Sequence, residues 1–244
     1  VEIRFVNERL MADLNAAKDA AEEASAAKSR FLAVASHDLR QPLHAVTLLN
    51  GLLGRPQPPQ SIVEISRHMA RSLATLERLF SSVLDFSKLE AATVKPSLAW
   101  VALPALVEQV AAEYRPNAAL KGLTLTHNCD DVEIHTDAHL MERILRNLLE
   151  NAVKFTHRGA VSIAAGFAGD AFIVTVADTG PGVPANLRGE IFKEYFQVRD
   201  RKADEGLGLG LAIVQHLAGL LDMAVSVRDN LPQGALFELR IPGD

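Results

Sequence analysis

Apolar residues repeat at helical spacing through the N-terminal third of the chain. Over residues 1–30, two series recur every seven residues, with one polar break: Ile3, Leu10, Ala17, Ala24 and Phe31, and Val6, Asp13, Ala20, Ala27 and Val34. A sustained seven-residue repeat is typical of a coiled coil. We therefore expect a coiled-coil helix over residues 1–30, with a single amphipathic helix docked on its own domain as the open alternative.

The same pattern runs without a stop signal into a second helical stretch, which ends near Gly51–Gly54. Its apolar stripe leaves His37 and Gln41 on the opposite, polar face, and Pro42 predicts a kink just past the histidine. The members of the stripe recur at spacings of three and four residues: Leu32, Ala35, Leu39, Leu43, Val46, Leu49 and Leu53. This spacing predicts a helix with one buried face.

A further helix is predicted from Ser61 to about Ala91, after a proline-rich loop over residues 55–60. Ser61 and Glu64 form a candidate capping box at its start. Its apolar stripe contains Ile62, Ile65, Met69, Leu73, Leu76, Leu79, Val83 and Phe86. A hairpin of two such helices cannot cover both stripes, whereas two hairpins form a four-helix bundle. We therefore expect a homodimer.

Beyond a linker at residues 93–98, the pattern changes to alternating short strands and helices. Strands are predicted over residues 100–103, 123–127, 132–136, 160–167, 172–177, 224–228 and 235–241. Helices are predicted over residues 104–120, with Pro116 bending or ending the first, then from the Asp137 cap to about Phe155, and over residues 209–221. This order indicates an α+β domain with helices on one face of a sheet.

Composition narrows the classes of function. The chain has 244 residues, a net charge of −5 and one cysteine, Cys129. These values argue against nucleic-acid binding, a disulfide framework and a cysteine metal cluster. No apolar run approaches the ~20 residues of a transmembrane helix. The single cysteine fits a reducing compartment, so we expect a cytoplasmic location for this part of the protein. Because the chain does not begin with Met, we expect a fragment of a longer protein, whose membrane attachment stays open.

Three groups of residues could carry chemistry. His37 is followed by Asp38, which pairs a nucleophile with a base on one helix. Asn147, Asn151 and Lys154 share one face of a predicted helix, where amide oxygens suit Mg²⁺ and an ammonium suits phosphate. Their alternative is an ordinary polar helix face.

Two glycine-rich stretches form the third group. Asp178 ends an apolar strand and precedes Gly180 and Gly182, an arrangement that can accept a bond from an exocyclic amine, although turns look similar. Three more glycines open the helix at residue 209, where free N–H groups suit phosphate: Gly206, Gly208 and Gly210. Between them, residues 191–196 and the polar stretch 197–205 are predicted to form a lid over a ligand.

Five motifs in this order resemble the sensor histidine kinases of two-component signalling. SHDLRQPL resembles the H box, NLLENAVKFT the N box, DTGPG the G1 box, IFKEYF the F box and GLGLGLAIV the G2 box. The resemblance implies an all-α helical hairpin, a four-helix bundle on dimerisation, followed by an α+β Bergerat-fold ATP-binding sandwich. The implied domains are a coiled-coil signal helix over 1–30, a dimerisation and phosphotransfer domain over 31–92, and a catalytic ATP-binding domain over 99–244.

The resemblance also implies roles for individual residues. His37 accepts the γ-phosphoryl group of ATP, with Asp38 as general base, and Asn151 holds Mg²⁺. Asp178 receives the adenine amino group. The other implied contacts to ATP are Asn147, Lys154, Phe155, Gly180, Gly182, Phe196, Gly206, Gly208 and Gly210. The phosphoryl group then passes to an aspartate of a response-regulator receiver domain, and an upstream sensor domain lies outside this fragment.

Two positions depart from the usual H box. Asp38 stands where the family more often has Glu, and Gln41 stands where it usually has Thr or Asn, which puts phosphatase activity in doubt.

Two other functions remain to be weighed: a non-catalytic dimeric scaffold with a nucleotide-sensing domain, and an ATPase clamp of the same superfamily. The intact H and N boxes argue against both. The signal, the cognate regulator, whether phosphorylation occurs within or between subunits, and whether a receiver domain follows residue 244 stay open.

Overall fold

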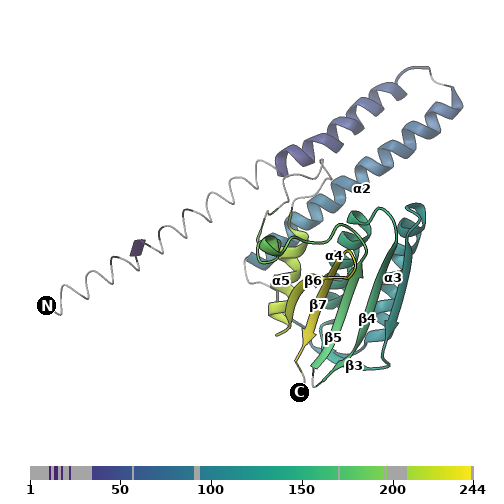
Figure 1. Cartoon of the computed structure of the whole chain (residues 1–244). Helices are drawn as coiled ribbons and strands as arrows, with labels where there is room; N and C mark the ends of the chain where they lie inside the picture. Colours follow the sequence, from purple (N-terminus) through teal and green to yellow (C-terminus); the bar gives the residue numbers. More distant parts are fainter. Residues whose placement is uncertain are drawn as a thin grey trace. The chain divides into compact units, whose positions relative to one another are not determined.

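The computed structural model describes residues 11, 14–15, 18, 22, 35–56, 58–90, 94–169, 171–194, 196 and 208–242. They divide into two compact units, with the boundary in the chain between Val83 and Leu84 (Figure 1). Most of the predicted coiled coil lies outside the described residues, so that seam stays a prediction. Within the described part of the chain, no helix has both the length and the apolarity needed to cross a membrane.

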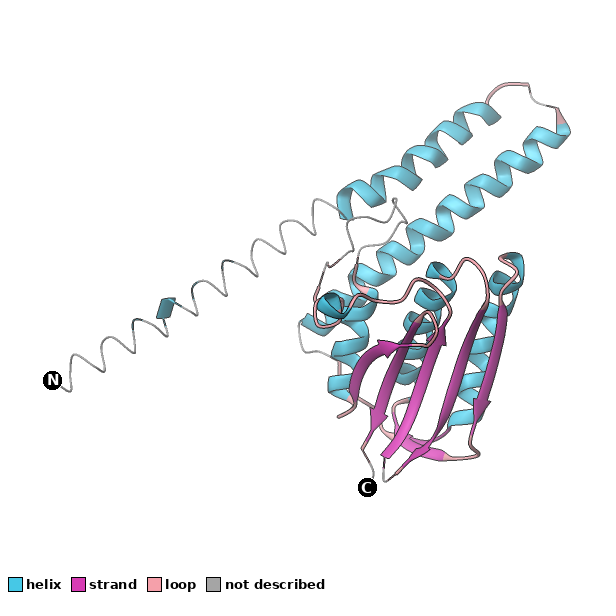
Figure 2. Cartoon of the chain, viewed as in Figure 1, coloured by secondary structure: helices cyan, strands magenta, loops and turns pink. Residues whose placement is uncertain are grey.

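The first unit contains a helical hairpin up to Val83, and the last residues of its second helix belong to the second unit. Residues 35–53 are helical, a turn follows at residues 54–55, and α2 (Pro59–Glu90) returns alongside (Figure 2). The first helix continues through Pro42. The predicted cap at Ser61 is wrong, because α2 begins two residues earlier. A proline in the first turn of a helix has its φ preset and lacks an N–H that would need a partner, which favours this earlier start.

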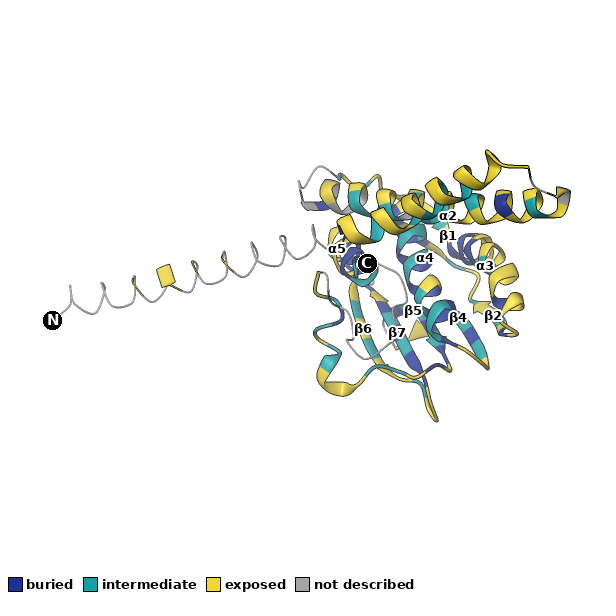
Figure 3. Cartoon of the chain, turned by 90° about the horizontal axis from the view of Figure 1, so that it is seen from above, coloured by how far each residue is buried: buried dark blue, intermediate teal, exposed yellow. Residues whose placement is uncertain are grey.

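One hairpin leaves much of its apolar surface uncovered. Ala35 and Ile65 are buried, but Leu43, Leu73 and Phe80 are 57%, 50% and 55% exposed. Exposed residues run along both helices (Figure 3). An exposed contiguous apolar face on a helix pair is typical of a surface that packs against a partner.

The second unit is a layered α+β domain. Its five-stranded sheet has the order β2-β4-β5-β7-β6, in which β2 pairs with β4 in parallel and the other neighbours are antiparallel. The strands are β2 (Thr124–Cys129), β4 (Ala160–Ala168), β5 (Ala171–Asp178), β6 (Ala224–Asp229) and β7 (Ala235–Ile241). A separate antiparallel pair joins β1 (Ala99–Ala102) to β3 (Glu133–Thr136).

Three helices cover one face of this sheet (Figure 1). They are α3 (Leu103–Leu120), α4 (Ala138–Phe155) and α5 (Gly210–Leu220). The central helix α4 buries a full apolar stripe: Leu140, Met141, Ile144, Leu145, Leu148, Leu149, Ala152 and Val153. Inward residues of β4, β5 and β7 complete the core, because successive side chains of a strand alternate between the two faces.

The predicted elements and the α+β class are confirmed, with ends that differ by one or two residues. Pro116 does not end α3, which runs four residues further to Leu120. The sequence patterns missed the short 3₁₀ helix η1 (Ala185–Leu187) and did not separate the β1–β3 pair from the main sheet.

Asp137 caps α4, as predicted. Its Oδ1 accepts from the backbone N–H groups of His139 and Leu140 at 2.9 and 3.0 Å, and its Oδ2 accepts from the N–H of Ser97 at 2.7 Å. Burial acts to raise the pKa of this carboxyl, but the three N–H groups hold the pKa below its ordinary value. One side chain therefore starts α4 and ties the linker before β1 to it.

We expect D137A to lower the free energy of unfolding by about 1–2 kcal/mol, because helix-capping bonds of this kind are lost. D137N is the matched variant, since it keeps the capping oxygen but cannot titrate. A depressed pKa stabilises the fold fully above the unfolded value of 3.8, and this contribution is lost as the pH falls below it. Urea unfolding should therefore show the stability gap between wild type and D137N shrinking below about pH 4. A gap that does not change with pH would contradict this assignment.

Candidate active site

His37 lies on the polar face of the hairpin, as predicted. Its side chain is 64% exposed, and its Nδ1 is 3.1 Å from Oδ1 of Asp38, whose side chain is 20% exposed. If Nδ1–H donates to the carboxylate, the imidazole carries its lone pair on the outward Nε2. Gln41 is also exposed, one turn further along the helix. This arrangement presents a nucleophilic nitrogen to solvent beside a base.

In the second unit, Asn147 and Asn151 of α4 face the start of α5. The point where a β-carbon on Gly210 would stand is 3.1 Å from Oδ1 of Asn147 and 3.8 Å from Nδ2 of Asn151. Asn147 also donates from Nδ2 to the carbonyl of Arg143 at 2.8 Å. The structure therefore brings the predicted amide pair against one of the predicted glycines, as a joint site requires.

The C-terminal turn of α4 is held by the lysine that follows α3. Lys121 donates from Nζ to the carbonyls of Val153 and Lys154, at 2.9 and 2.8 Å. Carbonyls at a helix C-terminus lack intrahelical donors, and a lysine ammonium satisfies them well. Lys154 itself lies over the ring of Phe155, with its Nζ 5.2 Å from the ring centroid. Lys121 thus fixes the end of the helix that carries these two predicted contacts.

Asp178 is a buried carboxylate at the end of β5, with an exposure of 6%. Its Oδ1 accepts from the N–H of Gly180 at 2.7 Å and from the N–H of Ala235 at 3.4 Å. Its main-chain oxygen accepts from Nδ2 of Asn230 at 2.8 Å. A buried charge is tolerated when it is hydrogen-bonded in this way, and it suits the recognition of a donor group.

Glycines make the close packing around this carboxylate possible. Gly182 has φ +71°, and a β-carbon there would stand 2.9 Å from the carbonyl oxygen of Gly234. A β-carbon on Gly234, at φ +129°, would stand 1.8 Å from the carbonyl oxygen of Asp178. The loop between β6 and β7 therefore lies directly against the turn that follows Asp178.

Asn230, Gly234 and Thr156 were missed by sequence reasoning. Asn230 and Gly234 are more than fifty residues from Asp178 in the chain, and no local spacing connects them. Thr156 follows α4 and is 0% exposed, and its Oγ1 has no hydrogen-bond partner among the described residues. Thr156 is the last residue of the NLLENAVKFT motif. At that position the sequence indicates the end of a helix and gives no sign of a ligand contact.

The structure describes only some of the remaining predicted nucleotide contacts. Phe196 is half-buried, and its N–H donates to the carbonyl of Lys193 at 3.4 Å. Gly208 has φ +67°, a conformation that glycine adopts at little cost. Gly206 and the predicted lid over residues 197–205 lie outside the described residues, so their roles stay predictions.

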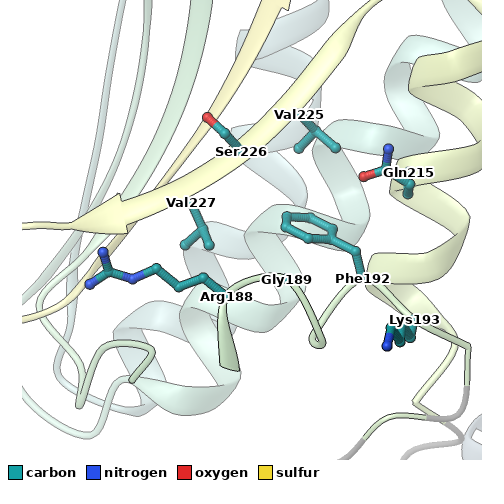
Figure 4. Close-up of a pocket in the computed structure, with 8 residues that line it drawn as sticks. All are labelled: Arg188, Gly189, Phe192, Lys193, Gln215, Val225, Ser226 and Val227. Atoms are coloured by element: carbon teal, nitrogen blue, oxygen red, sulfur yellow. The ribbon is translucent and has the colours of Figure 1, made fainter. Parts of the chain in front are cut away.

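A pocket of about 550 Å³ lies beside β6 and α5 (Figure 4). Phe192 and the β6 residues Val225 and Val227 form apolar walls, and Gln215 of α5 faces them across the pocket. Arg188 lines it too, but is paired with Asp229. None of the residues that line this pocket is among the predicted nucleotide contacts. We therefore place the candidate nucleotide site at Asp178 and not in this pocket.

The donor set favours a metal that is shared with a ligand. Among the described residues, no group of three or more His, Cys, Asp or Glu side chains is arranged to hold a metal ion. Oδ1 of Asn147 lies at the α4–α5 contact, beside the amide of Asn151. Amide oxygens are hard donors of the kind that Mg²⁺ takes together with phosphate oxygens and water. The residues present therefore fit Mg²⁺ that arrives with a nucleotide better than a permanent protein-only metal centre.

Two family descriptions match this chain. The histidine kinase-, DNA gyrase B- and HSP90-like ATPase family matches residues 136–244, which contain α4, Asp178 and α5. The His Kinase A (phospho-acceptor) domain matches residues 27–92, which contain His37 and the hairpin. Together they cover both units that carry the candidate site residues.

Named relatives agree with these matches. Sensor histidine kinase RcsC of Salmonella typhimurium is 34% identical over 228 residues, which are 91% of this chain and 24% of RcsC. The structure of full-length ShkA in complex with AMPPNP has a TM-score of 0.66 at 32% identity, and covers 88% of this chain and 45% of ShkA. The structure of histidine kinase ThkA in complex with response regulator protein TrrA shares the fold, with a TM-score of 0.64 at 21% identity over 88% of this chain and 61% of ThkA. The chain thus spans about a quarter of RcsC.

We expect G182A to destabilise the ATPase domain by about 1–3 kcal/mol, because alanine is strained at a positive φ and its β-carbon would meet Gly234. G189A is the matched control, since a β-carbon there meets nothing within 4 Å. Urea unfolding of both variants measures the difference. Equal stability of G182A and G189A would show that this close approach is not required.

Proposed function

This chain belongs to the sensor histidine kinases, and from that membership we propose that it transfers the γ-phosphoryl group of ATP to His37. The observation that carries the proposal is the pair of sites in one chain: an exposed imidazole beside a carboxylate, and a buried carboxylate beside an asparagine-lined helix. The phospho-acceptor and ATPase family matches fall on these two sites.

In this proposal, Asp178 recognises adenine. A carboxylate accepts hydrogen bonds and cannot donate them when ionised, so it favours a base edge that carries an amino group. Its burial strengthens that preference, because an unpaired acceptor facing the carboxylate would be left without water. Lys154, at the other end of the nucleotide, neutralises phosphate charge.

Asn151, with Asn147 beside it, would hold Mg²⁺ through its amide oxygen. A Mg²⁺ ion held there would supply positive charge to the phosphate oxygens of ATP. The protein side chains position the reactants, which is most of what phosphoryl transfer asks of an enzyme.

At the acceptor, Asp38 holds the Nδ1 proton of His37 and so keeps the lone pair on Nε2. Nε2 forms the new P–N bond as the bond from the γ-phosphorus to the bridging oxygen of ADP breaks. Asp38 stabilises the positive charge that develops on the imidazole and takes the Nδ1 proton, as general base. Because Asp38 is one methylene shorter than Glu, its reach to the ring is set by its place next to His37 on the helix.

Two partners follow from this function. A second copy of the chain would cover the exposed apolar side chains of the hairpin, such as Leu43, Leu73 and Phe80, in a four-helix bundle.

A receiver domain of a response regulator would take the phosphoryl group from His37 onto an aspartate. Gln41, one turn beyond His37, would lie at that contact, where its longer amide makes phosphatase activity weak. An upstream sensor domain would supply the signal.

H37Q should abolish labelling by γ-labelled ATP while ADP still binds, because the acceptor nitrogen is removed and the ATP site lies in the other unit. H44Q is the matched control, since His44 is exposed on the same helix two turns away. Labelling that persists in H37Q would reject His37 as the acceptor, and loss of labelling in H44Q would point to a general effect on the hairpin.

D38N should slow labelling by about 100-fold, the scale of a lost general base, with little change in ADP affinity. D38E keeps the charge and should retain most of the rate. A rapid-quench time course at saturating ATP measures both variants. If D38N reacts at the wild-type rate, Asp38 is not the base.

A further inference from the structure

The hydroxyl of Thr156 is a buried polar group for which the described residues supply no partner. Thr156 is 0% exposed, and Oγ1 makes no hydrogen bond with the described residues. Leaving such a group unpaired is unfavourable, and valine would fill the same volume without that penalty. A threonine at this position therefore suggests that the hydroxyl gains its partner when a ligand binds.

The surroundings of Thr156 show which ligand that is. Thr156 is the residue that ends α4, and its N–H donates to the carbonyl of Ala152 at 3.1 Å. The point where a β-carbon on Gly180 would stand is 2.8 Å from Oδ1 of Asp178 and 3.2 Å from Oγ1 of Thr156. The hydroxyl and the buried carboxylate thus both lie close to one point beside Gly180, at the place assigned to adenine.

The carboxylate alone can recognise only one of the two polar groups on this edge of adenine. That edge carries an amino group, which donates, next to ring nitrogen N1, which accepts. An ionised carboxylate can take the first bond but has no proton for the second, whereas a threonine hydroxyl can donate. We propose that Thr156 is a specificity-determining residue, whose hydroxyl supplies the donor for N1 while Asp178 accepts from the amine. This inference rests on the proposed ATP-binding function.

The pair would also disfavour guanine. Guanine presents an oxygen acceptor where adenine presents its amine, so the Asp178 carboxylate would face another acceptor. The hydroxyl is closed off from solvent. It reaches N1 by rotation about the Cα–Cβ bond, since threonine has more than one staggered position for its hydroxyl. Lys121 holds the preceding turn of α4 in place, so this rotation need not move the helix.

The test compares ADP with 1-deaza-ADP, which keeps the amine and lacks N1, on wild type and T156V. Calorimetric titration should show that wild type binds 1-deaza-ADP about threefold to tenfold more weakly than ADP, as expected for one lost hydrogen bond. T156V should bind the two ligands equally. Its melting temperature without nucleotide should equal or exceed that of wild type, because the unpaired hydroxyl is gone.

Two further variants serve as controls. T175V makes the same substitution on β5, where the hydroxyl of Thr175 donates to the carbonyl of Ala164 at 3.3 Å, and it should keep the preference for ADP. T156S retains a hydroxyl at the site and should keep that preference as well. Loss of the preference in T175V would mean that the change acts through general stability, and the proposal would fall.

A preference for ADP that survives in T156V would overturn the role of Thr156. So would a drop in its nucleotide-free melting temperature with both ligands weakened equally, which is the behaviour of a purely structural hydroxyl. If D178N weakens ADP binding while T156V does not alter the preference, the ATP site stands and this inference alone fails. If wild type does not bind ADP, both the proposed function and this inference fail.

Discussion

Burial of one carboxylate is the constraint on which the nucleotide site depends. Asp178 ends β5, the middle strand of the sheet, so its charge lies where water cannot reach it easily. Such a charge must be compensated by donors from nearby backbone, and Gly180 and Ala235 supply them. Bringing that backbone so close leaves no space for a side chain at Gly180, Gly182 or Gly234. The glycine-rich motif is therefore a consequence of the buried charge as much as a contact for the ligand.

The packing of α4 sets the second half of the site. Its apolar stripe is buried in the core, which leaves Asn147 and Asn151 beside the first turn of α5. Asp137 fixes where the helix begins, and Lys121 fixes where it ends. Because both ends are held, the amides, Lys154, Phe155 and Thr156 keep a defined position relative to Asp178. Stability of the core and geometry of the site thus depend on the same helix.

Much of this could be predicted from residue patterns, and the failures have physical reasons. The apolar period of α4, the Asp137 cap and the strand that ends at Asp178 are local signals, and the structure confirms them. The Ser61 cap failed because a proline two residues earlier starts the helix equally well. Asn230 and Gly234 could not be found, because they meet Asp178 through strand pairing between distant segments. The partnerless hydroxyl of Thr156 is a property of three-dimensional packing, which no spacing reveals.

The acceptor histidine and the nucleotide site obey opposite requirements, which accounts for their placement in separate units. Asp178 is buried, whereas His37 is exposed. In the proposed function, Asp178 would recognise its ligand by exclusion of water, whereas His37 would have to meet both ATP and an incoming receiver domain. The most direct test of this account is the chemical stability of the label after incubation with γ-labelled ATP and Mg²⁺. We predict a label that is lost in acid and kept in alkali, as expected of a P–N bond to histidine. A label that survives acid would place the phosphate on a hydroxyl group and would contradict the account.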